Sequence, residues 1–531
     1  VVKQHDKPPL DMDNSSAILA RDLMLDFPQI QYVARLAGAG FPPVIRRGEV
    51  TLSERAFLWA DPDFFKVLPL PAVAGDPRTA LDAPDAVVLT RAAARKYFGR
   101  DAPLGGVLLV DGRPMRVTAV IEDMPSNTHL TGEVFASSRA SFSLLRQFEA
   151  AGYSSNANFT YLRLKPGASA AALQAALPNF LERRIMPSQR ILNPDMQLDR
   201  YVIRLKPLTA IHLQPADGGD LKPGADVKVL LGIGVIGVLI VVVAAINFVT
   251  LMTARASRRA VEVGVRKALG AQRRDLIAQF MGEALVYVAV ALVLAVAIAE
   301  LVLPGVNAAL QRKIAFDYLG DPALMAAMLS AAAVTALLAG VYPALVLSSF
   351  RPSAVLKGGP IAGGGGVLVR QALVVAQFAV LIMLLLGTLT IYRQTMFALK
   401  DATRTDNDGV LILFASPCSD TLRDAIRALP GVQAAACSSP AAVELNHMMD
   451  MVNMRGRNTF LYYAPVDFGF LEVYGVRPLA GRLFSRDRPT DDGALLKDTA
   501  PGIVINESAV RALGFKSPQA AVGQLVTWHF A

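Results

Sequence analysis

Several residue types and motifs are scarce in this chain, and each absence argues against a class of protein. Charged residues make up 18% of its 531 residues against 53% hydrophobic ones, which argues against a single soluble domain. The sequence contains no Gly-x-x-x-x-Gly-Lys-Ser/Thr loop, so we expect any ATP to be bound by another subunit. It also lacks a Gly-x-Ser-x-Gly nucleophile motif. We therefore predict a chain that is not an enzyme.

Histidine and cysteine are also sparse. The five histidines (His5, His129, His212, His447 and His529) have no metal-ligand spacing, so we predict no metal and no cofactor in this chain. The two cysteines, Cys418 and Cys437, each lie at the end of a strand-like run. A disulfide between them is one interpretation in an oxidising compartment. Two free, partly buried thiols are the alternative, which we favour because the sequence fixes no geometry.

The positive charge is concentrated at a few places. The net charge is +9, and ten of the Lys and Arg residues fall in two segments beside apolar runs, 255–280 and 351–370. No basic face carries interleaved aromatic residues of the kind that bind single strands. This distribution indicates membrane lipid and membrane topology, and we expect no nucleic-acid partner.

Long apolar runs are what the chain has in abundance. Residues 229–254 contain no charged side chain, and a membrane helix needs about 20 apolar residues. We predict four membrane helices, at 229–252, 280–303, 322–348 and 371–392. A Gly-rich stretch at 351–370 reads as a flexible linker between the last two.

The basic residues predict the orientation of these helices. Segment 255–280 carries seven Lys and Arg residues against two acidic ones, and 351–370 carries three with no acid. Positive residues beside membrane helices mark the cytoplasmic side. Residues 1–226 and 393–531 then both lie on the other side of the membrane.

The first of these outer regions reads as an α+β domain. Residues 86–90 (AVVLT) and 115–121 (MRVTAVI) are strand-like, and Asp111-Gly112 between two apolar runs predicts a hairpin turn. A helix is expected at 168–184, after a strand at 160–165.

The second outer region repeats motifs of the first. DPDFFKVLPLPAVAG at 61–75 matches DFGFLEVYGVRPLAG at 467–481, VVLTRAAAR at 87–95 matches IVINESAVR at 503–511, and FPQIQYV at 27–33 echoes LPGVQAA at 429–435. We therefore expect two copies of one fold. The chain starts at Val1 without an initiator methionine and ends at Ala531 directly after a strand-like run, so we expect a fragment whose second copy is truncated.

The membrane-proximal sequence INFVTLMTARASRRAVEVGVRKALGA, at 246–271, resembles the signature of FtsX-like, MacB-like ABC transporter permeases. DPDFFKV, VVLTRAAARKYFG, VIEDMPSNTHL and LTAIHLQP resemble the MacB-type periplasmic core domain. The resemblance implies a membrane α-helical bundle with α+β periplasmic domains. It divides the chain into a core domain at 1–226 whose opening helix is missing, an FtsX-like permease domain with three helices at 227–350, the cytoplasmic linker, the fourth helix, and a truncated second core domain at 393–531.

The same resemblance implies a coupling site within 255–280. It consists of Glu262, Val263, Gly264, Val265, Arg266, Lys267, Ala268, Leu269, Gly270 and Ala271, which would form a short cytoplasmic helix that docks into an ATPase. The alternative is an amphipathic helix lying on anionic lipid headgroups, which would use the same basic residues.

The function implied is that of a permease subunit in the bacterial inner membrane. It would couple ATP hydrolysis by a cytoplasmic ABC ATPase to motion of its periplasmic domains for export or extraction of a substrate, with a periplasmic adaptor and an outer-membrane channel as further candidate partners. The alternative, from another class, is an FtsX-like signalling scaffold that regulates a periplasmic partner such as a cell-wall hydrolase. No motif in the sequence identifies a substrate.

Overall fold

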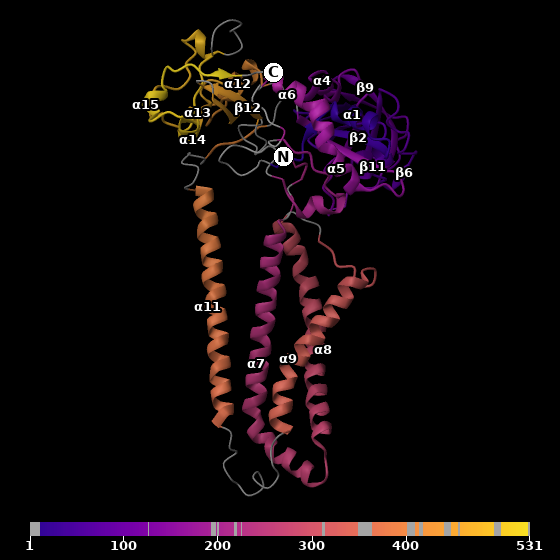
Figure 1. Ribbon diagram of the computed structural model, residues 1–531, viewed down its shortest axis with the longest axis vertical. Coiled ribbons are helices and arrows are strands. Elements are labelled where there is room, and N and C mark those ends of the chain that lie inside the picture. The colour runs from indigo at the N-terminus through magenta and orange to yellow at the C-terminus, as the bar shows by residue number, and fades with distance from the viewer. Residues whose placement is uncertain are drawn as a thin grey trace. The chain divides into compact units, whose positions relative to one another are not determined.

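The computed structural model in Figure 1 describes most of the chain and divides it into two compact units. The described residues are 11–125, 127–154, 156–192, 198, 201–216, 220–222, 224, 226–310, 314–348, 364–400, 409–413, 418–439, 448–454, 457–492 and 501–528. His5, His447, His529 and most of the predicted linker lie outside these ranges. One unit is formed by the two soluble regions, 1–225 and 405–531, and the other by 226–404.

The first soluble region contains a mixed sheet and short helices. Its strands are β1 (Ser15–Ser16), β2 (Ile30–Gly38), β3 (Val44–Arg47), β4 (Val50–Ser53), β5 (Phe57–Ala60), β6 (Ala72–Ala74), β7 (Ala86–Thr90), β8 (Val107–Val110), β9 (Arg113–Ile121), β10 (Val134–Ser137) and β11 (Asn156–Leu164). Its α-helices are α1 (Leu19–Asp26), α2 (Phe64–Val67), α3 (Arg91–Phe98), α4 (Leu144–Ala150), α5 (Ala170–Phe180) and α6 (Met186–Leu192), and a π-helical turn joins the last two. This is the α+β architecture predicted for the region.

The strands form one sheet in the order β1-β11-β2-β5-β10-β7-β9-β8-β3-β4, with β6 paired to β9. The pairs β5–β10 and β7–β9 are parallel, and the others are antiparallel. Because β5 and β10 run in the same direction, the residues that follow them, Asp61 and Ser138, lie at the same edge of the sheet. That edge carries a polar site described below.

The central strands are buried on both faces, which explains their unbroken apolar sequences. Along β5, Phe57 and Trp59 belong to one core cluster, whereas Leu58 and Ala60 belong to another. Successive residues of a strand point to opposite faces, so both faces are covered. α2 contributes to one cluster through its two phenylalanines, and α3 contributes to the other.

The hairpin predicted at Asp111-Gly112 is present between β8 and β9. Both turn residues have positive φ, 47° and 78°, as a type I′ turn requires. Asp111 also accepts a hydrogen bond from the Val44 backbone through its side chain, which ties the turn to the neighbouring strand β3.

The second unit consists of long apolar helices: α7 (Val227–Ala268), α8 (Arg273–Leu310), α9 (Pro322–Ser348) and α11 (Gly364–Lys400). Among the described residues, three stretches are long and apolar enough to cross a membrane, Val227–Leu251, Arg273–Ala309 and Gln371–Ala398, and α9 contributes the shorter apolar stretch Pro322–Leu338. α9 packs closely on α8: a Cβ at Gly340 would lie 2.9 Å from the Met281 sulfur.

The helix boundaries correct the sequence analysis at three places. The basic segment after 254 is not a separate short helix, because α7 continues without a break to Ala268. α8 begins seven residues before the span predicted at 280–303 and continues through Pro304 to Leu310, beyond the predicted end. α11 begins at Gly364, inside the predicted flexible linker, and continues to Lys400, beyond the predicted start of the soluble region at 393.

The second soluble region contains α12 (Asp420–Arg427), β12 (Met448–Met454), β13 (Arg457–Tyr463), α13 (Phe470–Val473), α14 (Glu507–Ala512), α15 (Pro518–Ala521) and β14 (Thr527–Trp528). The strands form a small antiparallel sheet in the order β13-β12-β14. Val452, Met454 and Leu513 form its buried cluster.

Candidate functional site: a basic elbow and two anchored aspartates

The chain turns sharply between α7 and α8, at residues 269–272, and we call this turn and the helix ends beside it the elbow. Gly270 has φ +99°, a left-handed conformation that favours glycine. The Ala271 N–H donates to the Arg266 carbonyl and the Gly270 N–H to the Lys267 carbonyl, each at 3.0 Å. This is the paired hydrogen-bond pattern of a Schellman C-cap, so the end of α7 is fixed by local sequence.

The start of α8 is fixed in a complementary way. Asp275, in its first turn, accepts a hydrogen bond from the Gln272 N–H at 3.0 Å, as the acidic member of a capping box does. An acidic side chain there also interacts favourably with the positive end of the helix dipole. The elbow therefore has defined caps on both sides.

Arg266 joins the two sides of the elbow. Its guanidinium forms an ion pair with Glu262 one turn earlier in α7, at 2.7 Å, and donates to Gln279 on α8 at 2.6 Å. Behind it, Val263, Leu276, Phe280 and Ala344 form a buried cluster that joins α7, α8 and α9. The elbow is therefore packed against all three helices.

The predicted coupling residues fall into distinct environments within this elbow. Val263 is buried and Arg266 is engaged internally, whereas Leu269 at the tip is 83% exposed. Arg274, just beyond the turn, is 81% exposed at its side chain. The outward-facing chemistry of the elbow is thus an apolar side chain beside basic ones, a feature that basic-residue counting did not identify.

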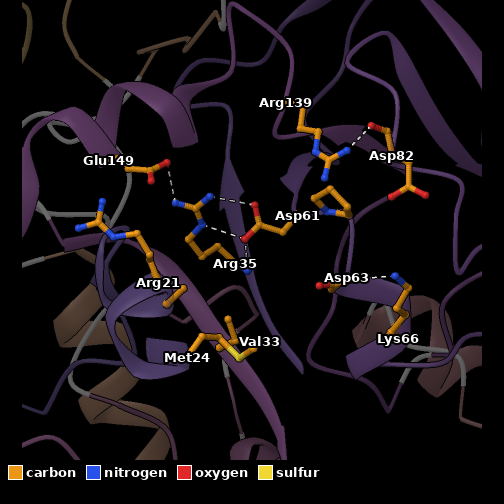
Figure 2. Close-up of a pocket in the computed structure, with 12 residues that line it drawn as sticks. Arg21, Met24, Val33, Arg35, Asp61, Asp63, Lys66, Asp82, Arg139 and Glu149 are labelled. Carbon is orange, nitrogen blue, oxygen red and sulfur yellow. Dashed lines mark hydrogen bonds and ion pairs between the residues drawn. The ribbon is translucent and has the colours of Figure 1, made fainter. Parts of the chain in front are cut away.

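A second polar site lies at the sheet edge of the first soluble region (Figure 2). The Asp61 carboxylate, which follows β5, receives two hydrogen bonds from the Arg35 guanidinium on β2, at 2.8 and 3.0 Å, and one from the Ser138 hydroxyl at 2.6 Å. Arg35 also donates to the Ala17 carbonyl and to Glu149 of α4. One side chain therefore ties together the approach to α1, strand β2, the end of β5 and α4.

Arg35 and Asp61 are largely buried, with 14% and 13% of their side chains exposed. Burial lowers the pKa of Arg35, but hydrogen bonds and charges from Asp61 and Glu149 outweigh it, so the pKa is raised. The pair lines a pocket of about 320 Å³. Equal numbers of acidic and basic side chains line the pocket: Arg21, Arg35, Lys66 and Arg139 against Asp61, Asp63, Asp82 and Glu149. Its charges therefore balance internally.

Asp467 of the second soluble region has related surroundings. Its carboxylate receives a 2.7 Å hydrogen bond from Arg423 of α12, whose side chain is 6% exposed. That hydrogen bond is the largest cause of the raised pKa of Arg423. The Asp467 N–H donates to the Cys437 carbonyl at 2.9 Å, as the Asp61 N–H donates to the Arg35 carbonyl at 3.1 Å.

The two cysteines adjoin this second site. The structure joins Cys418 to Cys437 in a disulfide, with Cα atoms 6.1 Å apart, within the range a disulfide bridges. The preference for two free thiols was therefore wrong. The sequence could not decide between them because it does not show that the residue before α12 and the strand-like segment after it are adjacent.

Comparison with known families matches both parts of the chain. Residues 2–180 match the MacB-like periplasmic core domain, and residues 234–352 match the FtsX-like permease C-terminal family. A pyoverdine export ATP-binding/permease protein of Pseudomonas aeruginosa is 24% identical over 356 residues, covering 66% of this chain and 48% of that protein. The chain belongs to the MacB/FtsX-like family of ABC transporter permeases.

Solved structures are also similar in part. A domain of a permease protein from Porphyromonas gingivalis shares 23% identity, covers 34% of this chain and 77% of that chain, and gives a TM-score of 0.29. The periplasmic region of MacB from Actinobacillus actinomycetemcomitans shares 16% identity, covers 34% and 85% of the two chains, and gives a TM-score of 0.25. The chain spans about half the length of the curated relative that it matches.

The family assignment confirms the resemblance seen in the sequence. The two matched domains are those of inner-membrane ABC transporter permeases with a periplasmic domain. Among the described residues, no group of three His, Cys, Asp or Glu side chains could hold a metal ion. In this permease, His129 makes a 2.9 Å hydrogen bond with the Tyr161 hydroxyl, and burial lowers its pKa.

The sequence analysis did not single out Arg35 or Asp61 as a site. Asp61 was noted only as the first residue of a repeated motif, and Arg35 matches no motif at all. A charged residue within the apolar strand-like stretch 30–38 is the signal that could have marked it. Its partner depends on the strand order, which the sequence does not supply.

Proposed function

We propose that this permease transmits ATP-driven motion from a cytoplasmic partner ATPase to its periplasmic core domain, for export or extraction of a substrate. The elbow around Leu269 would be the ATPase contact, and ATP would be bound by the partner. The pyoverdine export protein named above is similar to this chain and favours export, although the substrate of this chain is not implied by it.

The continuity of α7 is the observation that carries this proposal. One helix of 42 residues begins at its Asp226 N-cap, directly after the core domain, and ends at the elbow. At 1.5 Å per residue it is about 63 Å long, roughly twice the hydrocarbon thickness of a bilayer. Within α7 the helix is unbroken from Val227 to the elbow, so motion at the elbow would be carried along its whole length.

We further propose that the second soluble region is a second copy of the core domain. Several pairs of features support this. α13 begins and ends 406 residues after α2, and Gly75 and Gly481 at the same offset have φ +76° and +74°. The side chains of Thr90 and Asn506, 416 residues apart, each cap a helix by accepting from the residue three positions later.

The proposed topology has four membrane helices, with the elbow and 351–370 in the cytoplasm and both soluble regions in the periplasm. An adaptor and an outer-membrane channel would be the periplasmic partners of an exporter. The positive-inside rule and the proposed repeat support the same arrangement independently. Gln272→Cys should be protected from an impermeant maleimide in intact spheroplasts, whereas Asp82→Cys and Gln519→Cys, both at exposed positions, should react. The opposite pattern would invert the topology.

Docking is tested best at the outward-facing residues. Leu269→Glu places a charge on the exposed tip without altering the caps, and it should abolish stimulation of the partner ATPase in the reconstituted complex. Gly270 is unsuitable because any side chain there would strain the turn. The matched control is Leu319→Glu, which changes another highly exposed leucine, 96% accessible, in the loop between α8 and α9.

We expect the Leu319 variant to keep full stimulation. If the Leu269 variant also keeps it while inserting normally into the membrane, the docking proposal is wrong, and the elbow would instead be an interfacial amphipathic segment. Binding of both variants to anionic vesicles would then be compared, since a lipid-surface role predicts weaker binding by the Leu269 variant. Among the described residues, no feature favours the signalling alternative over export.

A further inference from the structure

Asp61 and Asp467, the two anchored aspartates, allow the soluble regions to be compared position by position. The Asp61 N–H donates to the Arg35 carbonyl, and the Asp467 N–H donates to the Cys437 carbonyl. In the β2–β5 pair, Leu36 lies opposite Ala60, and the isolated bridge Ser438–Val466 has the corresponding position. These pairings place Cys437 where the first region has Arg35, an offset of 402.

The same offset aligns the helices that precede these strands. Arg21 and Asp22 of α1 correspond to Arg423 and Asp424 of α12. In both helices the arginine Nε donates to the next residue's carboxylate, at 3.2 Å in α1 and 3.3 Å in α12. Cys418 then corresponds to Ser16, which lies just before α1.

The two regions use different groups to bind the aspartate and to attach the segment before the helix. In the first region Arg35 is the arginine that binds Asp61, and it also donates to the Ala17 carbonyl before α1. In the second region a cysteine at that position cannot bind the aspartate. Arg423 binds Asp467 instead, and the disulfide connects Cys437 to the segment before α12.

We propose that the Cys418–Cys437 disulfide replaces the Arg35 clamp, by which we mean the hydrogen bonds of Arg35 to Asp61 and to the Ala17 carbonyl. Thiol exchange at this disulfide would make the attachment of α12 sensitive to dithiols. This inference rests on the proposed second copy of the core domain. The disulfide lines a pocket of about 350 Å³, together with Asp420, Arg423 and Ser438. Cys418 is exposed whereas Cys437 is half-buried, so Cys418 offers the sulfur that a dithiol reaches.

The exchange reaction needs no reagent other than the dithiol. A thiolate of the dithiol attacks the Cys418 sulfur, forming a mixed disulfide and expelling Cys437 as a thiolate, which takes a proton from water. The second thiol of the dithiol then displaces Cys418. The products are two protein thiols and the oxidised dithiol. α12 would keep the Arg423–Asp467 ion pair but lose its covalent link to the segment around Cys437.

The test measures hydrogen exchange in the full-length permease with and without dithiothreitol. On reduction, exchange in α12 should become faster by about tenfold or more, because removing a disulfide makes local opening easier. Exchange in α1 of the same molecules should not change. Alkylation followed by mass analysis should show that both cysteines are released under native conditions. Cysteines that resist release, or α12 exchange that is unchanged after release, would overturn the proposal.

Two variants separate the clamp from the disulfide. Cys418→Ser with Cys437→Ser should give fast α12 exchange whether or not dithiothreitol is present. Cys418→Ser with Cys437→Arg should restore slow exchange in both conditions, because an arginine there can bind Asp467 as Arg35 binds Asp61. If the arginine variant exchanges as fast as the serine variant, the disulfide is not a replacement for the clamp. ATPase stimulation measured on the oxidised protein tests the proposed transport function separately.

Discussion

The first core domain and the region after α11 hold a corresponding aspartate by different chemistry. In the first, a single buried arginine on a strand binds the carboxylate bidentately and contacts two further elements. In the second, an arginine on a helix binds the carboxylate, and a disulfide supplies the remaining link. The difference teaches that aspartates placed by the same kind of backbone pairing can be neutralised by side chains from different elements.

The largest expected difference follows from removing the arginines. Arg35→Ala would leave the Asp61 carboxylate, 13% exposed, without its bidentate partner. Breaking a buried pair in this way costs about 3–5 kcal/mol. Arg423→Ala should destabilise its region less, because the disulfide still ties α12 to the strand. Hydrogen exchange in β2 and in α12 of the full-length variants measures both effects, and equal losses would contradict the division of tasks.

A second comparison uses two glycines with the same backbone conformation. An alanine at Gly481 would meet only the Val522 side chain at 3.3 Å, so its cost should be about 1 kcal/mol of left-handed strain. An alanine at Gly75 would place its Cβ 2.6 Å from the Thr118 carbonyl oxygen and 3.0 Å from the Ala119 Cα. Because these are backbone atoms of β9, we expect a clearly larger loss of protection in β6 and β9. Equal costs would show that the sheet edge yields.

How far the sequence predicts these features depends on whether they are local. The type I′ hairpin and the strand at 86–90 follow from residues adjacent in the chain, and the structure has both. Apolar length likewise predicted most of the helical membrane region. The continuation of α7 through Ala268 was missed because the change from apolar to basic residues was interpreted as a helix boundary, although the basic segment also forms helix readily.

The anchored aspartates illustrate the opposite case. The motif match aligns Asp61 with Asp467, but their partners come from other elements. Arg35 is 26 residues before Asp61, and Arg423 is 44 residues before Asp467. The disulfide depends on the same tertiary arrangement. The sequence therefore predicts a repeat from one chain, but it does not predict the interactions that stabilise each proposed copy.

Lowering the pH should change the stability of the two regions in opposite directions. Burial, and a hydrogen bond that the protonated Asp220 carboxyl donates to Asp13, raise the pKa of Asp220, in the first region, from 3.8 to about 6. The stability it contributes is therefore complete below pH 3.8 and is lost as the pH rises through about 6. A hydrogen bond from Arg482 lowers the pKa of Asp491, in the second region, to about 2. Its contribution is present above pH 3.8 and is lost as the pH falls through about 2.

Segment-resolved hydrogen exchange, corrected for its intrinsic pH dependence, measures this contrast. Between pH 7 and 4 the segment around Asp220 should become more protected, whereas the loop around Asp491 should lose protection only below pH 4. Asp220→Asn should remove the first response, since an amide does not titrate, while Lys206, which binds Asp13 at 2.6 Å, remains in place. Responses of the same sign in both segments would be inconsistent with these assignments.

The smallest effect, and the one expected to be equal in the two regions, concerns the helix caps. The Thr90 hydroxyl accepts a hydrogen bond from the Ala93 N–H at 3.3 Å at the start of α3, and the Asn506 side chain accepts one from the Ala509 N–H at 2.9 Å at the start of α14. Replacing either by alanine should cost about 1 kcal/mol, because one helix N–H loses its partner. Thr90→Ser and Asn506→Ser are the matched controls, since serine caps equally well. Protection in the first turns of α3 and α14 should fall by similar factors in the alanine variants and stay unchanged in the serine variants. A large loss at one cap alone would mean that the two helices do not occupy equivalent positions, and the proposed repeat would then lose its support in this part of the chain.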